Sequence, residues 1–273
     1  MNETRAIPTV LTIAGSDPSG GAGIQADLKA FVTTGAYGAA VITGLTAQNT
    51  MEVSGTLPVP GDFVEKQLNA VLSDIRIDVI KLGMLTSRDI CEALVPFLKD
   101  RPVVCDPVMI STTGYQLIDE DTAQALINGI LPVSDYITPN RFELEKIHGS
   151  AAGDILAAGR ELMGRFNNLD GIVLKGGHIC KDASTVTDTL IYRKDDGIQE
   201  AAESRPRYDT PNTHGTGCTF ASAFASFLAQ GNIPAQAFSK AVDYTNYLIG
   251  VSADIRIGHG RGPLMHHLST SYS

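Results

Sequence analysis

Cysteine is scarce in this sequence and shows no paired motif. The four cysteines form no C-x-x-C pattern, and their spacing to the six histidines is not that of a zinc site. A reducing, cytoplasmic compartment therefore fits the chain best. The cysteines are Cys91, Cys105, Cys180 and Cys218, of which the first three are interpreted as packing or surface residues.

Long basic runs and long apolar runs are absent as well. The net charge is −9 and no Lys/Arg run occurs, so nucleic acid and anionic membrane surfaces are poor partners. No apolar run approaches the roughly 20 residues that span a bilayer, and no basic segment followed by an apolar signal region stands at the N-terminus. An anionic substrate would have to be neutralised locally, by a few cations, a helix start or a metal ion.

The sequence does contain a regular alternation of short β-branched segments and helical patterns. With 273 residues, of which 43% are hydrophobic, the chain can bury a full core. No internal repeat, low-complexity linker or composition break occurs, so we expect one domain over residues 1–273. Strands are predicted at 9–14, 39–43, 79–81, 103–105, 136–138, 171–174 and 187–193, and helices at 23–34, 62–73, 87–99, 121–130 and 154–166 and from Thr219 and Pro234.

This alternation predicts an α/β fold with a mainly parallel sheet flanked by helices on both faces. The segments 53–59 and 199–207 break the alternation and are interpreted as edge strands or flaps. In such sheets, ligands bind at the carboxyl ends of the strands. Polar and glycine-rich clusters follow the predicted strands at residues 15–23, Gln48, 83–84, Asp106, Asn140, 175–178 and 214–218, and they indicate an extended active-site crevice.

The segment from Asn212 to Gln230 joins a glycine-rich turn to the start of an apolar helix. Gly215 and Gly217 carry no Cβ and admit an anion close to the backbone, where the free amides of a helix start favour negative charge. Cys218 stands at the junction, so we expect its thiol pKa to lie below the usual value of about 8.5. The segment indicates an anion hole beside an ionisable group. The alternative is a plain turn and helix start with a buried cysteine.

Residues 15–23 lie between a predicted strand and a predicted helix, where nucleotide-binding loops occur. The Walker A pattern fails because no Lys-Ser/Thr pair follows the glycines. Residues 21–26 match G-x-G-x-x-A, but the connection from the strand is too long and residues 46–48 offer no acid for a ribose diol, which disfavours a dinucleotide site. Asp27 could face the crevice and bind a substrate hydroxyl. On spacing alone, a solvated helix carboxylate is the simpler interpretation.

Three residues point to phosphate and metal chemistry. Asp106 follows a strand, and Asn140 and Glu143 form an N-x-x-E pattern that brings both side chains to the first turn of a helix. Asp106 and Glu143 could together hold hydrated Mg²⁺, with nucleotide phosphates supplying the other oxygens. The alternative is that Asn140 is only an N-cap and Glu143 its capping-box partner.

Lys175 stands at a strand end before two glycines. Its ammonium could contact a phosphate while the glycines admit a nucleotide, and the alternative is a lysine in a surface loop. The adjacent His266 and His267 cannot easily share one ion, so no metal site is predicted there.

Nine motifs occur in an order that is typical of one kinase family. They are A-G-S-D-P-S-G-G-A-G-I-Q-A-D-L-K at 14–29, G-A-Y-G at 35–38, A-Q-N-T at 47–50, K-L-G-M-L at 81–85, D-P-V-M at 106–109, T-P-N-R-F-E at 138–143, K-G-G-H at 175–178, H-G-T-G-C at 214–218 and G-R-G-P at 260–263. With them the chain resembles the hydroxymethylpyrimidine/phosphomethylpyrimidine kinases from about Thr9 to His267. The resemblance implies the ribokinase-like fold, with ATP and substrate in one crevice. It also implies an enzyme of thiamine biosynthesis that phosphorylates 4-amino-5-hydroxymethyl-2-methylpyrimidine and then its monophosphate, giving the diphosphate.

The resemblance also implies roles for single residues. Gln48 would bind the amino group and a ring nitrogen of the pyrimidine, because a side-chain amide offers both a donor and an acceptor. Asp106 and Glu143 would organise Mg²⁺ and the ATP phosphates, and Cys218 stands where sugar kinases of the superfamily carry an aspartate base. The other implied assignments are Gly15, Asp27, Met84 and Val108 in the substrate pocket, Lys175, Asn140 and Thr216 at ATP and its phosphates, Gly215, Thr216 and Gly217 in the anion hole, and a homodimer.

Two other functions stay open. A pyridoxal kinase of the same subfamily shares the glycine-rich segment and the Gly-x-Gly-Cys motif, but such relatives tend to differ around Gln48. A non-catalytic nucleotide or pyrimidine sensor is the second, and the presence of Lys175, Glu143 and Cys218 together argues against it. The 273 residues leave no room for a fused thiamine-phosphate synthase domain, so none is expected.

Overall fold

The computed structural model describes residues 7–111, 114–178, 184–195 and 197–271. Its strands are β1 (Thr9–Ser16), β2 (Tyr37–Gln48), β3 (Val53–Pro58), β4 (Val79–Leu82), β5 (Val103–Cys105), β6 (Tyr136–Ile137), β7 (Gly171–Leu174), β8 (Thr185–Lys194) and β9 (Gly197–Pro206). Its α-helices are α1 (Gly23–Thr34), α2 (Gly61–Leu72), α3 (Arg88–Leu98), α4 (Glu120–Ala125), α5 (Arg141–His148), α6 (Ile155–Arg165), α7 (Thr216–Ala229) and α8 (Pro234–Ser252).

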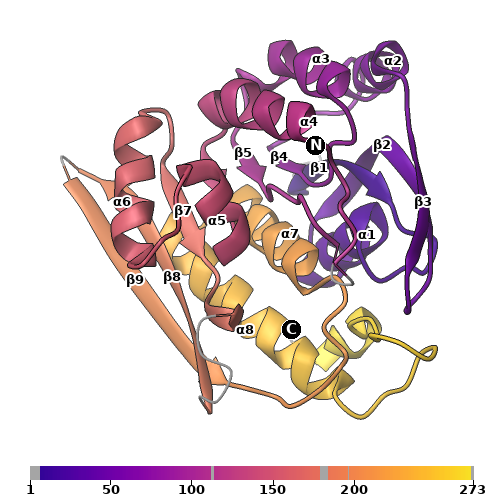
Figure 1. Ribbon diagram of the computed structural model, residues 1–273, viewed down its shortest axis with the longest axis vertical. Coiled ribbons are helices and arrows are strands. Elements are labelled where there is room, and N and C mark those ends of the chain that lie inside the picture. Colours follow the sequence, from indigo (N-terminus) through magenta and orange to yellow (C-terminus); the bar gives the residue numbers. More distant parts are fainter. Residues whose placement is uncertain (1–6, 112–113, 179–183, 196, 272–273) are drawn as a thin grey trace, which may run out of the picture.

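The strands form one nine-stranded sheet in the order β3-β2-β1-β4-β5-β6-β7-β8-β9 (Figure 1). The strands from β2 across to β7 run parallel to their neighbours. The strands β3, β8 and β9 pair antiparallel. The two segments that break the strand–helix alternation therefore form the two edges of the sheet, as β3 and β9. The predicted mainly parallel α/β fold and its edge strands are confirmed.

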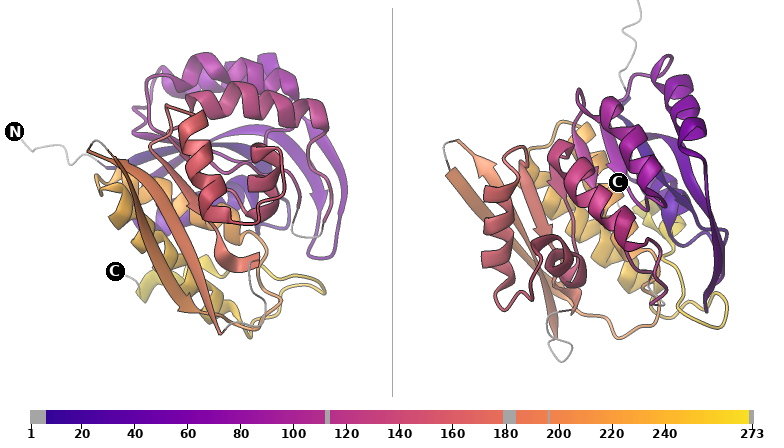
Figure 2. Two further views of the ribbon diagram at one scale, coloured as in Figure 1. Left: turned by 60° about the vertical axis from the view of Figure 1, so that its left-hand side comes forward. Right: turned by 45° about the horizontal axis from the view of Figure 1, so that its top comes forward.

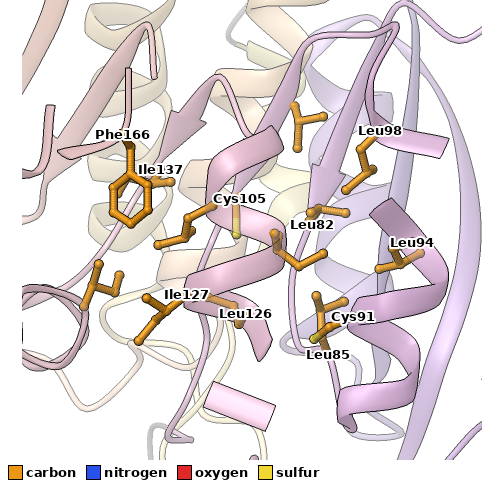
Figure 3. Packing of buried hydrophobic residues seen from close by; sticks show 14 of the residues in the cluster. Leu82, Leu85, Cys91, Leu94, Leu98, Cys105, Leu126, Ile127, Ile137 and Phe166 are labelled. Atoms are coloured by element: carbon orange, nitrogen blue, oxygen red, sulfur yellow. The ribbon is translucent and has the colours of Figure 1, made fainter. Parts of the chain in front are cut away.

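Two hydrophobic cores lie on opposite faces of the sheet, because neighbouring residues of a strand point to opposite sides. In β5, Val103 and Cys105 belong to the first core and Val104 to the second. Helices α2 to α6 cover the first core, part of which Figure 3 shows. Helices α1, α7 and α8 cover the second (Figure 2). Cys91 and Cys105 are buried, which confirms their interpretation as packing residues, and Cys180 lies outside the described residues.

The helix predicted at 121–130 is interrupted. It is α-helical over α4 and then continues as a π-helical turn, Leu126–Ile130, and a 3-10 turn, Leu131–Val133. Pro132 within the second turn has no amide hydrogen to donate, so regular α-helical bonding cannot continue there.

Helix α7 begins earlier than the expected start at Thr219. Gly215 adopts a left-handed conformation with φ of 79°, which is accessible to glycine at little cost, and the helix follows directly from Thr216. Cys218 consequently lies in the first turn of the helix, where it shares the environment of the free amides.

The parallel strands bring the predicted polar clusters to one edge of the sheet. Strand β1 ends at Ser16 and β2 at Gln48, and β5 and β7 end directly before Asp106 and Lys175. The first turn of α7 meets these strand ends from one face. No described helix is both long enough and apolar enough to cross a bilayer.

Candidate active site

A cleft of about 710 Å³ opens at the carboxyl ends of the parallel strands. This volume is within the usual range for small-molecule and cofactor sites. The residues predicted for the site line it, with the exception of Asp27. They are Gly15, Gln48, Met84, Asp106, Val108, Asn140, Glu143, Lys175, Gly215, Thr216, Gly217 and Cys218.

The N-terminus of α7 presents free amides to this cleft. A Cβ on the capping residue Gly215 would overlap the carbonyl oxygen of Gly21, so only glycine fits at this crossing of two loops. The amides of Gly217 and Cys218 donate no hydrogen bond to any described residue. Since a helix start also carries a partial positive charge, this turn has the features that favour a bound anion.

Thr216 differs from its neighbours in the same turn. Both its amide, at 3.3 Å, and its hydroxyl, at 2.9 Å, donate to the carbonyl oxygen of Thr213. The amide of Thr216 is therefore used within the turn, and the free amides are those of Gly217 and Cys218. A phosphate contact by Thr216 stays a prediction.

Cys218 is partly exposed and lines the cleft. Loss of water around the sulfur raises the pKa of this thiol to about 11, although Lys81 and the amide of Gly23 favour the thiolate. The expectation of a lowered pKa is wrong, because desolvation, reinforced by the negative charges of Asp27 and Asp106, outweighs the nearby ammonium of Lys81. The resting side chain is a neutral thiol near pH 7.

Asp106 and Lys175 form an ion pair, with 3.0 Å between Lys175 Nζ and Asp106 Oδ1. The hydroxyl of Thr138 donates to the same oxygen at 2.9 Å, so Asp106 Oδ2 has no hydrogen-bond partner among the described residues. A Cβ on Gly217 would lie 3.4 Å from Lys175 Nζ and 3.6 Å from Asp106 Oδ2, which places the pair against the start of α7.

Lys175 is therefore a lysine of the cleft, and its interpretation as a surface-loop residue is wrong. Burial disfavours its ammonium, but Asp106 and Glu143 outweigh that penalty and raise the pKa of Lys175. The positive charge is present at neutral pH, beside the free amides of α7.

Glu143 combines both roles that the sequence left open. The side-chain oxygen of Asn140 accepts a hydrogen bond of 3.0 Å from the Glu143 backbone amide. In return, Glu143 Oε2 accepts a hydrogen bond of 2.8 Å from the Asn140 backbone amide, and the two bonds form a complete capping box. The same carboxyl lines the cleft and is 3% exposed. Burial raises the pKa of Glu143 to about 7, opposed by Lys175 and reinforced by Asp106. Two acids in this position favour an additional cation.

Gly15 and Met84 lie in contact elsewhere in the wall of the cleft. A Cβ on Gly15 would overlap the terminal methyl group of Met84, and the hydroxyl of Thr43 fixes the Met84 carbonyl at 2.6 Å. Val108 adds a second apolar side chain, and Gln48 adds an amide. Apolar walls with one amide suit a flat heteroaromatic ring with one polar edge.

Asp27 does not reach the cleft, contrary to its assignment to the substrate pocket. Its carboxylate is fully buried and accepts two hydrogen bonds of 2.9 Å from Lys81 Nζ. The hydroxyls of Thr12 and Ser222 donate to the same group. Both sequence interpretations of Asp27, as a crevice residue and as a solvated carboxylate, are wrong because the buried ammonium on β4 holds it in the interior.

A buried pair between two glycine-rich loops was missed by reasoning from the sequence. His214 Nε2 lies 2.7 Å from Asp17 Oδ2, and both side chains are buried. Asp17 also accepts the amides of Gly21 and Ala22. Both partners stand inside motifs that the sequence displays, but only the sheet topology shows that the end of β1 and the start of α7 are neighbours.

One buried and one partly buried charge in strands were missed as well. Lys81 on β4 and Asp188 on β8 both line the cleft. The Gly176 amide donates to Asp188 Oδ1 at 2.7 Å, while burial raises the pKa of Asp188. A single charged residue within a β-branched segment gives no signal of its burial, so neither residue could have been placed without the structure.

Known proteins resemble the chain over most of its length. Residues 17–265 match the family model described as phosphomethylpyrimidine kinase. A hydroxymethylpyrimidine/phosphomethylpyrimidine kinase of Haemophilus influenzae is 40% identical over 266 residues, which covers 95% of this chain and 97% of that protein. The thiamine biosynthesis bifunctional protein ThiED of Geobacter sulfurreducens is 43% identical over 96% of this chain.

The chain spans about half of that bifunctional relative, 52% of its length. Among solved structures, an ADP complex of Bacillus subtilis pyridoxal kinase is similar with a TM-score of 0.82 at 30% identity, covering 96% of this chain and 98% of the other. The fold is thus one that pyridoxal kinases also adopt, and the substrate has to be inferred from the residues of the cleft.

Proposed function

The chain belongs to the phosphomethylpyrimidine kinase family, and on this basis we propose that it phosphorylates 4-amino-5-hydroxymethyl-2-methylpyrimidine and then its monophosphate with ATP, in thiamine biosynthesis. One observation carries the proposal. A single cleft contains both an amide suited to a pyrimidine edge, at Gln48, and phosphate-binding groups, at Lys175 and the start of α7.

The substrate ring would lie against the apolar side chains of Met84 and Val108. Gln48 is partly buried at the end of β2, so its amide can face both the protein and a bound ring. An aminopyrimidine presents a ring nitrogen that accepts and an amino group that donates, and a side-chain amide can satisfy both. This pairing supports the pyrimidine as the substrate.

Phosphoryl transfer depends mainly on positioning and on stabilisation of negative charge. The free amides of Gly217 and Cys218 and the ammonium of Lys175 surround one part of the cleft before any substrate binds. Donors that are fixed in advance stabilise developing charge without having to reorganise. In the proposed reaction these donors bind the transferred phosphoryl group. We assign Asn140, which lines the same cleft, to ATP binding.

The proposed cofactor is Mg²⁺, bound with ATP. In the described part of the chain no three His, Cys, Asp or Glu side chains are arranged to hold a metal ion, so phosphate and water oxygens would have to complete the coordination. The donor set fits that arrangement, because Asp106 Oδ2 has no hydrogen-bond partner in the described part of the chain and the pKa of Glu143 is raised to about 7 beside it. The ion would neutralise phosphate charge during transfer.

Glu143→Gln is expected to raise the Mg²⁺ concentration needed for half-maximal activity by about 10-fold, roughly the effect of losing one charged contact. The substitution keeps the hydrogen bond from the Asn140 amide, because a glutamine oxygen also accepts it. Mg²⁺ titrations of activity and calorimetric titrations of the ATP complex would measure the change. Glu161→Gln removes an exposed charge and is the matched control. An unchanged titration would assign Glu143 to helix capping alone.

The proposed general base is Cys218. Its thiol is protonated at rest because its pKa is about 11, so the base would be the small fraction of thiolate that forms when the thiol releases its proton to water. This thiolate would take the hydroxymethyl proton as the phosphoryl group moves. A modest base suffices in a loose transition state. In the second step the attacking phosphate oxygen is already anionic, and no base is needed.

We also propose that residues 1–273 form a single kinase domain and that the protein acts as a homodimer in the cytoplasm. The sheet is continuous from β3 to β9, which supports one domain. The edge strand β3 carries Leu57, which is 64% exposed, and Met51 just before it is 62% exposed. An apolar strand edge of this kind is a common place for a second copy to dock.

Pyridoxal phosphorylation is the second candidate function. The similarity to the Bacillus subtilis pyridoxal kinase favours it, with a TM-score of 0.82 over nearly the whole chain. The amide of Gln48 favours the pyrimidine instead, because it can pair with a ring nitrogen and an amino group at once. A sensor without catalysis is a weaker alternative, because the paired Lys175 and Asp106 and the free amides of α7 form a charged site ready for phosphate.

A substrate panel tests the proposed function. With Mg-ATP, we expect a kcat/KM for hydroxymethylpyrimidine at least about 10-fold above that for pyridoxal, since one well-placed hydrogen bond provides about that discrimination. Phosphorylated products would be separated by chromatography and identified by mass. A preference for pyridoxal would support the second candidate, and binding of the pyrimidine without ATP turnover would support the sensor.

A further inference from the structure

The buried imidazole of His214 touches two groups with the same nitrogen. Its Nε2 lies 2.7 Å from Asp17 Oδ2 and 3.3 Å from Gln48 Nε2. Gln48 is the residue proposed to recognise the substrate ring, whereas Asp17 lies in the loop after β1. A ring nitrogen carries either a hydrogen or a lone pair, so it cannot donate to Asp17 and accept from Gln48 at once.

The surroundings of Asp17 decide whether His214 Nε2 carries a hydrogen or a lone pair. Ser19 donates both its amide, at 2.9 Å, and its hydroxyl, at 2.7 Å, to one oxygen. The amides of Gly21 and Ala22 donate to the other, at 3.2 and 2.9 Å. Burial favours the neutral acid, but the hydrogen bonds from His214 and Ser19 hold the pKa of Asp17 below its usual value. Asp17 is a carboxylate, and His214 Nε2 therefore carries a hydrogen that points to it.

This hydrogen determines the orientation of the Gln48 amide. An N–H of Gln48 facing the N–H of His214 would be repelled, whereas a carbonyl oxygen there would accept the same hydrogen. On its other side the amide lies 3.2 Å from the hydroxyl of Thr46, which is also 3.1 Å from the Ser16 carbonyl. The single hydrogen of this hydroxyl can serve only one of the two acceptors, and we assign it to the Ser16 carbonyl, which is backbone and cannot turn away, whereas the Gln48 amide can turn over. That hydroxyl can accept but has no second hydrogen to donate. The amide oxygen and nitrogen are thus best satisfied with oxygen toward His214 and nitrogen toward Thr46.

We infer that His214, held by Asp17, is a positioning residue that fixes the polarity of the Gln48 amide and thereby sets the preference for an aminopyrimidine ring; this inference rests on the proposed function. One N–H and one oxygen lone pair of Gln48 remain free for the cleft, in a fixed order. They match a ring nitrogen beside an amino group. Pyridoxal has no amino group beside its ring nitrogen and gains nothing from this order.

The loops around His214 are packed tightly enough to hold it in place. A Cβ on Gly21 would overlap the imidazole ring, so the loop after β1 lies directly on it. The His214 amide donates to the Gly262 carbonyl at 3.1 Å, which attaches it to the C-terminal segment. That segment in turn bonds to Thr50, two residues after Gln48, through the Arg261 amide at 2.9 Å. The histidine and the glutamine are therefore positioned by one set of backbone contacts.

A double-mutant cycle tests the inference, with wild type, His214→Phe, Gln48→Ala and the double variant. Each single substitution should raise the KM for the pyrimidine about 10- to 100-fold, the usual effect of losing a hydrogen bond to a charged or fixed group. The double variant should be within about 3-fold of Gln48→Ala alone, because His214 acts through Gln48. The KM for ATP should change much less than that for the pyrimidine. Losses that multiply in the double variant would overturn the inference.

A control and a second variant keep the result interpretable. His266→Phe alters another buried histidine, which bonds to Thr219 at 3.0 Å, and it should leave the ratio of pyrimidine to pyridoxal kcat/KM unchanged. If His214→Phe does not fold, Thr46→Val removes the other anchor of the amide and should raise the pyrimidine KM by roughly 3- to 10-fold. An unchanged KM in Thr46→Val would contradict the fixed polarity. Absence of pyrimidine turnover by the wild type would refute the proposed function instead.

Discussion

Cys218→Ala is expected to slow phosphorylation of the hydroxymethylpyrimidine by about 100- to 10,000-fold, the usual contribution of a general base. Phosphorylation of the monophosphate should slow far less, because its attacking oxygen has no proton that must be removed. The backbone amides of α7 remain in the variant, so ATP binding should hardly change. Single-turnover rates for the two substrates give the ratio of the two losses. Equal losses would mean that Cys218 shapes the anion site and is not a base.

The ionisation of the same thiol can be measured separately. With a pKa of about 11, the thiol is neutral below that pH and gains its reactive thiolate as the pH rises. The rate of iodoacetamide modification at Cys218, followed by mass spectrometry, should rise about 10-fold per pH unit from pH 7 to 10 without a plateau. A plateau below pH 9 would restore the expectation of an acidic thiol at a helix start.

Gly215→Ala is expected to abolish most activity, with a kcat reduced by about 100- to 1000-fold, as for the loss of fixed donors at a reacting oxyanion. Two physical effects combine. A methyl group would overlap the Gly21 carbonyl, which is backbone and cannot rotate away, and the φ of 79° is strained for alanine. The loops must separate, and the amides of Gly217 and Cys218 move with them. A thermal melt should show a loss of about 1 to 3 kcal/mol.

Gly231→Ala separates the clash from the strain. Gly231 has a φ of 82° at the other end of α7, but nothing lies within 4 Å of an added Cβ. It should therefore cost about 1 kcal/mol of stability through strain alone and leave kcat unchanged. Equal activity losses in both variants would show that helix strain, and not the crossing of the loops, controls the site.

Periodicity was sufficient to predict the layers of the fold. Strand β5 and helix α1 have the bounds that β-branched and helical patterns indicated, because their residues contact the cores on predictable faces. The exceptions have local causes. Gly215 starts α7 early through its left-handed backbone, and Pro132 follows a π-helical turn that no apolar pattern announces.

The cleft could be predicted because parallel strands place their carboxyl ends at one edge, and most of the motif residues follow strand ends. The predictions that failed concerned residues whose environment depends on partners far away in the sequence. Asp27 is turned inward by Lys81, which lies 54 positions away along the chain. The pKa of Cys218 depends on how much water the folded loops exclude, and spacing cannot supply that quantity. The pairing of Asp17 with His214 joins residues 197 positions apart.

The most direct test of the central claim is to incubate the wild-type protein with Mg-ATP and hydroxymethylpyrimidine and to follow the products by phosphorus NMR. We expect a monophosphate to appear first and a pyrimidine diphosphate to accumulate from it, because one cleft contains the ring-binding amide of Gln48 and the phosphate-binding start of α7. Formation of pyridoxal phosphate from pyridoxal under the same conditions, with neither pyrimidine product formed, would contradict the account.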